Sequence, residues 1–404
     1  MKRRLAVLTE IIAPYRIPVF NALSRKAEID LHVIFLAETD SSMRRWRTYA
    51  DEIQFSYEVL PSWRRRLGKY NILVNQNVAS AVRKAKPEVI LCGGYNYLAS
   101  WQAARWARRN EVPFLLWCES TSSDQRGKHL LVESLKQNFL RNCDGFVVPG
   151  RSALAYMRQG GVPSGKVFVA PNAVDNDLFS ARGQIARGNS VRLRGELGLP
   201  ARYFLFVGRL VKAKGVADLL EAYGSLESEL RSQVGLAFAG DGPMRAELEA
   251  LSRSIFPGAV HFPGFVHRDE LASYYALAEC LVLPTHSDPW GLVVNEAMAC
   301  GLPVICTDVA GCAADLVKSN GRLVAARAPR RLADAMREIA TDPELRDHMS
   351  RESRKLVRSY SPDLCATAIS EAALAMQRRA TDNNVIWRNQ PSGTGNIPQP
   401  GVGD

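Results

Sequence analysis

Short runs that are apolar throughout alternate with helical patterns along the first half of the chain. These strand-like runs span residues 4–10, 29–37, 88–94, 113–119 and 145–150. Amphipathic helical patterns at 16–27 and 97–110 lie between them. Strands that are apolar on both faces and separated by helices are typical of parallel βαβ units. The first half is therefore predicted to form an open α/β domain.

The second half repeats this alternation. Its strand-like runs span residues 203–210, 234–243, 261–266, 280–285, 303–309 and 321–326. We expect two Rossmann-like parallel-sheet domains that face a central cleft, with ligands bound beyond the carboxyl ends of the strands. The predicted parts are a first domain at 1–175, a second domain at 176–365, a C-terminal helix at 366–380 that packs back toward the first domain, and a disordered tail at 381–404. The polar passage at about 180–200 is interpreted as a linker.

The net charge of +11 belongs entirely to the first half of the 404 residues. Residues 1–175 hold 26 Lys and Arg against 15 Asp and Glu, whereas residues 176–404 hold 26 of each. Trp46, Trp63 and Trp106 stand among these cations. Such a mixture suits an anionic membrane surface, and basic runs with aromatics also suit nucleic acid or form a solvated face. We expect membrane contact and no nucleic-acid partner.

The cysteines and the first residues bear on the compartment. Eight cysteines are scattered without paired spacing, which favours a reduced, cytoplasmic setting. The start of the chain imitates a signal peptide, but Glu10 interrupts its apolar run. No stretch approaches the roughly 20 apolar residues that span a bilayer. Any membrane contact is therefore expected to be peripheral, on the inner face of the cell membrane.

The segment 284–301, PTHSDPWGLVVNEAMACG, carries the strongest sign of chemistry. An apolar strand ends before it, a loop carries Asp288 to Gly291, and a helix is predicted from Leu292 to Cys300. A helix start presents unpaired N–H groups and favours phosphate. With Asp288 before that start and Glu296 after it, the segment suits a ligand that has hydroxyls as well as phosphates.

Two further loops follow strands of the second half. In the segment 208–215, Arg209 and Lys214 stand beside glycines and form a plausible diphosphate clamp. A lysine near a helix start is also ordinary architecture, so this loop alone leaves both interpretations open. The segment 240–243, GDGP, is interpreted as a structural turn into a helix.

Taken together, these motifs resemble a known enzyme family. GRLVKAKG, AGDGPMRAELE, HFPGFV and SDPWGLVVNEAMACGLPVICTD occur in this order, and the first half adds IIAPYRIPVFNAL and PNAVDNDLF. They are similar to the family 4 glycosyltransferases with the GT-B fold, over about residues 5–375. The resemblance implies a retaining hexosyltransferase that uses a nucleoside-diphosphate sugar and needs no metal or other cofactor.

The resemblance also implies roles for individual residues. The implied donor-site residues are Arg209 and Lys214 at the diphosphate, Glu296 at the ribose, Asp288 at the sugar hydroxyls with the N–H groups of Gly291, Leu292 and Val293, and Phe265 and Val266 near the base. Arg209, Lys214 and Asp288 would also support catalysis. The acceptor side is expected at Tyr15, Arg16, Gly94 and Tyr95.

Two positions depart from the family pattern. The family carries Glu where this chain has Asp288, and the shorter side chain moves the carboxylate by about one C–C bond. Many members place a His after the strand that here precedes Cys118, Glu119 and Ser120, whereas His129 lies well downstream. Glu119 is therefore a candidate catalytic residue in its place.

We accordingly expect a sugar transferase acting on a lipid-linked glycan acceptor in the synthesis of cell-surface polysaccharide or lipopolysaccharide. One alternative is a nucleotide-sugar epimerase or hydrolase on the same fold, with Glu119 or Asp124 as its acid–base group. Another is a non-catalytic protein that binds nucleotide sugars, or nucleic acid through its basic half.

Overall fold

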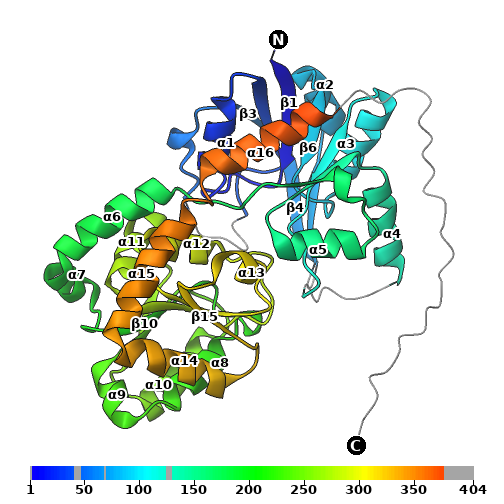
Figure 1. The fold of residues 1–404 in the computed structure, drawn as a ribbon. Coiled ribbons are helices and arrows are strands. Elements are labelled where there is room, and N and C mark those ends of the chain that lie inside the picture. Colours follow the sequence, from blue (N-terminus) through cyan, green and yellow to red (C-terminus); the bar gives the residue numbers. More distant parts are fainter. Residues whose placement is uncertain (1, 41–46, 68–69, 124–129, 377–404) are drawn as a thin grey trace, which may run out of the picture.

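The chain folds into two α/β domains, one above the other in Figure 1. The structure is a computed structural model that describes residues 2–40, 47–67, 70–123 and 130–376. Each domain is built on its own parallel sheet with helices on both faces. The predicted fold class, two Rossmann-like domains in the GT-B arrangement, is confirmed.

The described part of the first domain contains a seven-stranded sheet of order β3-β2-β1-β6-β7-β8-β9. Its strands are β1 (Arg3–Thr9), β2 (Ile29–Phe35), β3 (Ser56–Val59), β6 (Val89–Cys92), β7 (Phe114–Trp117), β8 (Gly145–Val148) and β9 (Val167–Val169). Its helices are α1 (Ile17–Ser24), α2 (Val78–Ala85), α3 (Leu98–Arg109), α4 (Leu130–Arg141) and α5 (Arg151–Gln159), with 3₁₀ turns η1 (Ala50–Glu52) and η2 (Ser164–Lys166). All residues of β6, β7 and β8 are buried, which explains why their sequences lack alternation.

In the second domain, the described strands form a six-stranded sheet of order β12-β11-β10-β13-β14-β15. Its strands are β10 (Tyr203–Val207), β11 (Gly235–Ala239), β12 (Val260–Gly264), β13 (Cys280–Leu283), β14 (Val304–Thr307) and β15 (Gly321–Val324). Its helices are α6 (Asn176–Gly188), α7 (Ser190–Leu197), α8 (Val216–Gly224), α9 (Ser228–Gln233), α10 (Arg245–Ile255), α11 (Arg268–Leu277), α12 (Leu292–Ala299), α13 (Ala313–Leu316), α14 (Pro329–Thr341) and α15 (Pro343–Val357), with the 3₁₀ turn η3 (Lys212–Lys214). The chain order reverses between β11 and β13 beside β10, so the loops after β10 and β13 open at this switch point.

The passage at 180–200, interpreted from the sequence as a linker, is helical, and that interpretation was wrong. α6 and α7 occupy most of it, and α6 packs on α11 and α12. The buried positions of α6 are Phe179, Gly183 and Ala186, which have helical spacing but include small residues. A side chain at Gly183 would meet the Sγ atom of Cys300 at 3.3 Å, so small size here lets the two helices approach.

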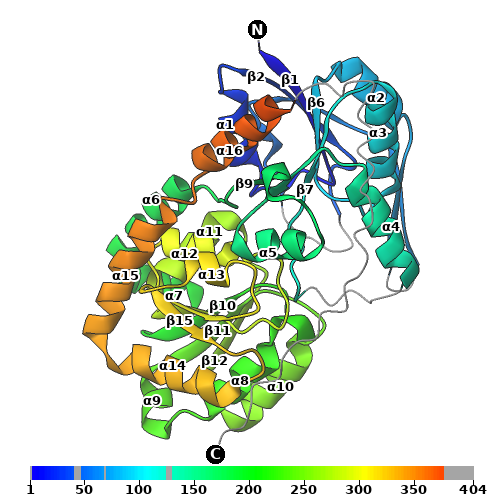
Figure 2. The same cartoon turned by 45° about the vertical axis from the view of Figure 1, so that its right-hand side comes forward.

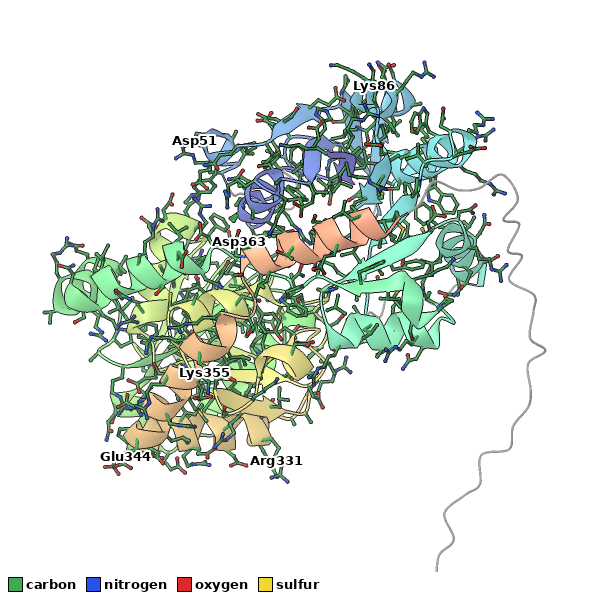
Figure 3. All side chains as sticks on the ribbon, turned by 45° about the horizontal axis from the view of Figure 1, so that its top comes forward. Asp51, Lys86, Arg331, Glu344, Lys355 and Asp363 are labelled. Carbon is green, nitrogen blue, oxygen red and sulfur yellow. The ribbon has the colours of Figure 1, made fainter. Side chains whose placement is uncertain are left out.

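A final helix, α16 (Pro362–Ala375), returns from the second domain to the first. It packs against α1, and its buried Cys365, Ile369 and Ala373 join the core that includes β1. Figure 3 shows this helix leading from Asp363 toward the first domain, while Lys355 on α15 remains on the second. The tail predicted to be disordered lies outside the described residues.

An antiparallel hairpin, β4 (Ser62–Leu67) and β5 (Tyr70–Asn75), is an addition that the sequence analysis did not predict. It follows the edge strand β3, and β5 packs beside α3. All eight cysteines are buried and unpaired. None of the helices within the described ranges has the length and apolar character needed to cross a membrane.

Candidate active site

A cleft of about 910 Å³ lies between the two domains, at the carboxyl ends of β10 and β13. All the residues predicted to bind the donor line this cleft: Arg209, Lys214, Phe265, Val266, Asp288, Gly291, Leu292, Val293 and Glu296. The first domain contributes Tyr15, Tyr49 and Glu119 to the opposite wall. The fold therefore gathers in one cavity groups that are almost 90 residues apart in the second half of the chain.

The start of α12 points into this cleft. Gly291 precedes the helix with φ of 98°, a left-handed conformation that glycine adopts without strain. The N–H groups of Gly291, Leu292 and Val293 donate to no backbone or side-chain group in the described part of the chain. Unpaired N–H groups at a helix start carry partial positive charge. They form a site for a phosphate or an ionised oxygen.

Lys214 and Asp288 meet beside this helix start, where the Nζ atom of Lys214 donates to Oδ2 of Asp288. Asp288 is 7% exposed, so the ammonium supplies the partner that a desolvated carboxylate requires. The two loops are joined through Ala213, whose carbonyl accepts from Thr285 Oγ1 at 3.0 Å and from the N–H of His286 at 2.9 Å. A side chain at Gly215 would fall 1.9 Å from the Pro284 carbonyl oxygen, so glycine permits this approach.

Arg209 lies on the loop after β10 and remains exposed in the cleft. Its guanidinium makes no ion pair with any residue that the structure describes, so it is free to bind an anion. The neighbouring turn at Gly240 supports this loop. A side chain there would lie 1.8 Å from the carbonyl oxygen of Gly208, which explains why glycine is needed and agrees with the structural interpretation of GDGP.

Glu296 lies one turn into α12 and is half-buried at the cleft wall. Burial raises the pKa of its carboxyl to about 7, against the opposing effects of the Tyr275 hydroxyl and the Arg268 charge. Tyr275 donates to Glu296 Oε2 at 2.7 Å from the neighbouring helix α11. The carboxylate is thus held in one orientation, with its other oxygen available to accept from a ligand hydroxyl.

This raised pKa predicts a pH dependence of ligand binding. If Glu296 binds the ribose as predicted from the sequence, its carboxylate accepts hydrogen bonds from the ribose hydroxyls above pH 7, whereas below pH 7 most of it is protonated. We expect the Kd of a nucleoside diphosphate to fall several-fold between pH 6 and pH 8. Glu296→Gln, titrated by calorimetry in the same buffers, reports the contribution of phosphate ionisation alone. Equal pH profiles for parent and variant would contradict the assignment.

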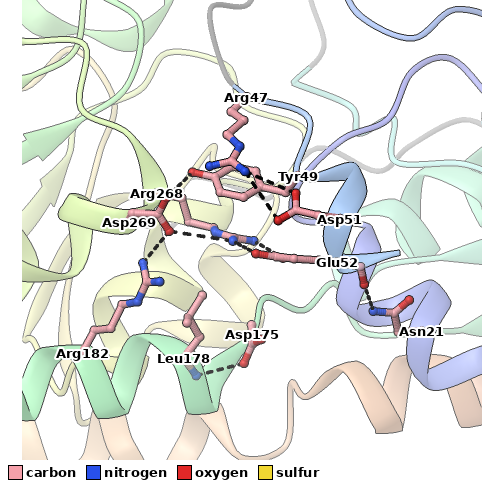
Figure 4. A network of polar contacts seen from close by, with 10 residues as sticks. All are labelled: Asn21, Arg47, Tyr49, Asp51, Glu52, Asp175, Leu178, Arg182, Arg268 and Asp269. Atoms are coloured by element: carbon pink, nitrogen blue, oxygen red, sulfur yellow. Dashed lines mark hydrogen bonds and ion pairs between the residues drawn. The ribbon is translucent and has the colours of Figure 1, made fainter. Parts of the chain in front are cut away.

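Where Arg268 lines the cleft, a network of polar contacts joins the two domains (Figure 4). Phe265 and Val266, just before Arg268 in the chain, line the same cleft. Arg268 pairs with Glu52 of the first domain and stacks over the Tyr49 ring at 3.8 Å. The Tyr49 hydroxyl donates to Asp269 at 3.0 Å. Phe265 is 39% exposed, which leaves an aromatic surface for a flat ring in the cleft.

The predicted acceptor residues line a second, adjoining cavity of about 210 Å³ in the first domain. Tyr15, Arg16, Gly94 and Tyr95 are all at its wall. Glu119 lines both this cavity and the main cleft, so it stands where the two meet. Hydroxyl, amide and charged groups beside aromatic rings suit a carbohydrate.

A chain of hydrogen bonds fixes Glu119 at this junction. Arg16 pairs with Glu119 and lies over the Trp117 ring at 3.9 Å. The Asn172 amide donates to Glu119 Oε1 at 3.0 Å, and the Asn172 carbonyl accepts from Asn295 at 3.1 Å. Since Asn295 lies on α12, the acceptor cavity is linked rigidly to the helix that carries Glu296.

Comparison with known proteins identifies the family. Residues 21–178 match the model described as Glycosyltransferase Family 4, and residues 193–356 match the model described as Glycosyl transferases group 1. The chain belongs to the family 4 glycosyltransferases. The first match covers the described strands of the first sheet except β1, and the second covers the described strands of the second sheet.

Individual relatives of this glycosyltransferase are more distant. It is similar to the D-inositol 3-phosphate glycosyltransferase of Xylanimonas cellulosilytica, with 32% identity over 230 residues that cover 55% of each chain. The match thus spans only about half the length of that curated relative. Among solved structures it resembles sucrose-phosphate synthase from Thermosynechococcus elongatus, with a TM-score of 0.70 and 22% identity over 91% of this chain and 98% of that one. HepE from Anabaena, solved with UDP and glucose, has a TM-score of 0.73 and 17% identity over 93% and 100%.

The sequence did not predict several residues that line this glycosyltransferase's cleft or lie buried behind it. Tyr275 and Asn295 sit among apolar neighbours and give no motif of their own. Asn172 lies in PNAVDNDLF, a segment that contributed to the family resemblance at the boundary between the two domains but was given no role in the site. Tyr49 comes from a first-domain loop with no recognisable pattern. Asp124, considered for the alternative reaction, and His129 lie outside the described residues.

Proposed function

We propose that this glycosyltransferase moves a hexose from a nucleoside diphosphate to a glycan acceptor with retention of the anomeric configuration. The observation that carries the proposal is the convergence of unpaired N–H groups at the α12 start with Arg209 and Lys214. This positive cluster faces two carboxylates, Asp288 and Glu296, in the same cleft. Cations and N–H groups suit the diphosphate, and carboxylates suit ribose and sugar hydroxyls.

The chemistry follows from where charge develops. The bond between the sugar anomeric carbon and the diphosphate oxygen breaks, which builds negative charge on the leaving diphosphate. Arg209, Lys214 and the start of α12 stabilise that charge without reorganising. The acceptor oxygen bonds to the anomeric carbon on the same face, and its proton passes to the departing diphosphate oxygen. Asp288 holds the sugar hydroxyls during this step.

Glu119 is a first-domain carboxylate that lines both cavities, as does Tyr15. Arg16 and Asn172 hold its carboxylate, so it is oriented to accept a hydrogen bond from the acceptor or the sugar. We propose that it takes the place of the family's His as a positioning group between the two substrates.

The proposal extends to the setting of the reaction. A basic first domain that carries the acceptor cavity favours a lipid-linked glycan at the inner face of the cell membrane. In this proposal the protein acts in the cytoplasm as a peripheral membrane enzyme of cell-surface polysaccharide or lipopolysaccharide synthesis.

The direct test measures nucleoside diphosphate release from a panel of nucleoside-diphosphate sugars, with and without a membrane glycolipid extract. Transfer predicts release that depends on the extract and a new glycolipid whose anomeric proton shows the donor's configuration by NMR. Release at the same rate without acceptor would instead establish the hydrolase, and formation of an isomeric nucleotide sugar would establish the epimerase. Either outcome would overturn the proposed transfer.

Since Arg209, Lys214 and the helix start supply the positive charge, we expect no metal requirement. Turnover in the presence of excess EDTA should stay within about twofold of the untreated rate, measured with the donor that the panel identifies. A loss of about tenfold or more that is restored by added Mg²⁺ or Mn²⁺ would show that the residues alone are insufficient.

A further inference from the structure

The outer face of the β4–β5 hairpin exposes apolar side chains that no other described part of the chain covers. Trp63 is opposite Val74, and Arg65 is opposite Ile72, so these four residues share one face of the ribbon. Trp63 is 56% exposed, Ile72 38% and Val74 37%. A two-stranded ribbon is marginally stable alone in water, so three exposed apolar residues side by side on it need an explanation other than packing.

The inner face of the same hairpin is firmly attached to the first domain. Leu73 is buried, and Arg64, opposite it, pairs with Asp40 and Glu10. Asp40 is itself buried and its carboxylate is neutralised by this guanidinium. The alternation along each strand therefore separates an anchored inner face from an exposed outer face, and the outer residues are held out toward solvent.

Positive charge lies on the outer face and on a helix that packs beside the hairpin. Arg65 is exposed on it. The helix α3, which packs beside β5, carries exposed Arg105, Arg108 and Arg109. The whole excess charge of +11 belongs to residues 1–175. A nucleic acid would bind the arginines but would leave the aliphatic side chains of Ile72 and Val74 in water. A lipid interface, in contrast, accommodates Trp, aliphatic side chains and cations together.

We propose that the outer face of the β4–β5 hairpin seats the protein on an anionic lipid bilayer, with Trp63, Ile72 and Val74 entering the interface and Arg65 binding headgroups. The hairpin is joined to the acceptor cavity, because Arg64 on its inner face pairs with Glu10, which lines that cavity. Seating on this face would hold the first domain, which carries the acceptor cavity, at the membrane surface. This proposal rests on the proposed function, because it explains how the enzyme would reach a lipid-linked acceptor. Membrane binding itself depends only on the hairpin surface and not on catalysis.

The test uses cosedimentation of the full chain with vesicles of phosphatidylcholine containing about 30% phosphatidylglycerol, at low and at 0.5 M salt. The variant Trp63→Ser/Ile72→Ser/Val74→Ser removes the apolar face. Its matched control, Ile185→Ser/Val191→Ser/Leu251→Ser, removes three exposed apolar side chains from the second domain. Arg65→Gln tests the charge separately. Thermal unfolding and the donor-induced thermal shift confirm that each variant is folded with an intact cleft.

We expect the parent and the control to bind the anionic vesicles, and the hairpin variant to bind at least tenfold more weakly. Arg65→Gln should lose about fivefold at low salt, the factor for one interfacial cation. Equal binding by the hairpin variant and the control would overturn the proposal, as would a parent that ignores these vesicles or binds only RNA. Because vesicle binding is measured without substrate, its failure is separate from failure of the proposed transfer.

Discussion

Glu296→Ala is expected to weaken binding of the nucleoside diphosphate by about 10- to 100-fold, because hydrogen bonds to a charged group are worth about 1.5–3 kcal/mol. The carboxyl is held by Tyr275 at 2.7 Å and faces the cleft one turn after the α12 start. Its loss removes the acceptor for the ribose hydroxyls while leaving the phosphate site in place. Calorimetric titration of the diphosphate measures the change directly.

Two companion variants separate binding from folding. Glu221→Ala removes an exposed glutamate from α8 and should leave the Kd unchanged. Tyr275→Phe keeps the carboxyl but loses its orienting hydroxyl, so the Kd should rise less than in Glu296→Ala. If Glu296→Ala is folded, as judged by thermal unfolding, and binds the diphosphate as tightly as the parent, the ribose assignment is wrong.

Lys214→Ala is expected to lower kcat by about 10²–10³-fold, the usual loss when one preorganised donor to a developing oxyanion is removed. Lys212→Ala is the matched control, since it lies in the same 3₁₀ turn, is exposed, and does not line the cleft. The two variants differ only in which lysine of one short turn is lost. Near-parent kcat for Lys214→Ala would remove the diphosphate clamp from the mechanism.

Lys214 also neutralises Asp288, so its removal leaves a buried carboxylate unpaired and should reduce stability. The double variant Lys214→Ala/Asp288→Asn removes that penalty. We expect it to recover thermal stability. Because Asp288 itself holds the sugar hydroxyls, the kcat of the double variant is compared with that of Asp288→Asn alone, and a further loss in the double variant reports the action of the lysine on the phosphate. Equal kcat in the two variants would show that the lysine only stabilises the loop.

The two-domain fold was predictable because its parallel strands are buried on both faces and separated by helices. Strands such as β13, with every residue buried, therefore read as continuous apolar runs. The donor side was predictable for a related reason. In such sheets functional loops follow the carboxyl ends of strands, so Arg209, Asp288 and Glu296 could be placed together from their order alone.

Other features left no signal of this kind. α7 has no buried residue, so it carries no apolar stripe, and α6 buries Gly183 where a larger side chain would have marked the pattern. The contacts of Tyr275 with Glu296 and of Asn172 with Asn295 join segments brought together only by the fold. The segment that forms the β4–β5 hairpin was interpreted only as part of the basic first half. Three consecutive arginines in it obscure the alternation of polar and apolar residues that is typical of a strand.

The central claim is that the cleft between the domains binds a nucleoside-diphosphate sugar through its phosphates and ribose. A thermal-shift panel of nucleoside diphosphates and their sugars tests it most directly, because a ligand at 100 times its Kd stabilises the folded state by about 2.7 kcal/mol. We predict that one nucleoside diphosphate raises the Tm of the parent by several degrees and that Arg209→Ala removes most of that rise. No shift with any member of the panel, or an equal shift in Arg209→Ala, would contradict the account.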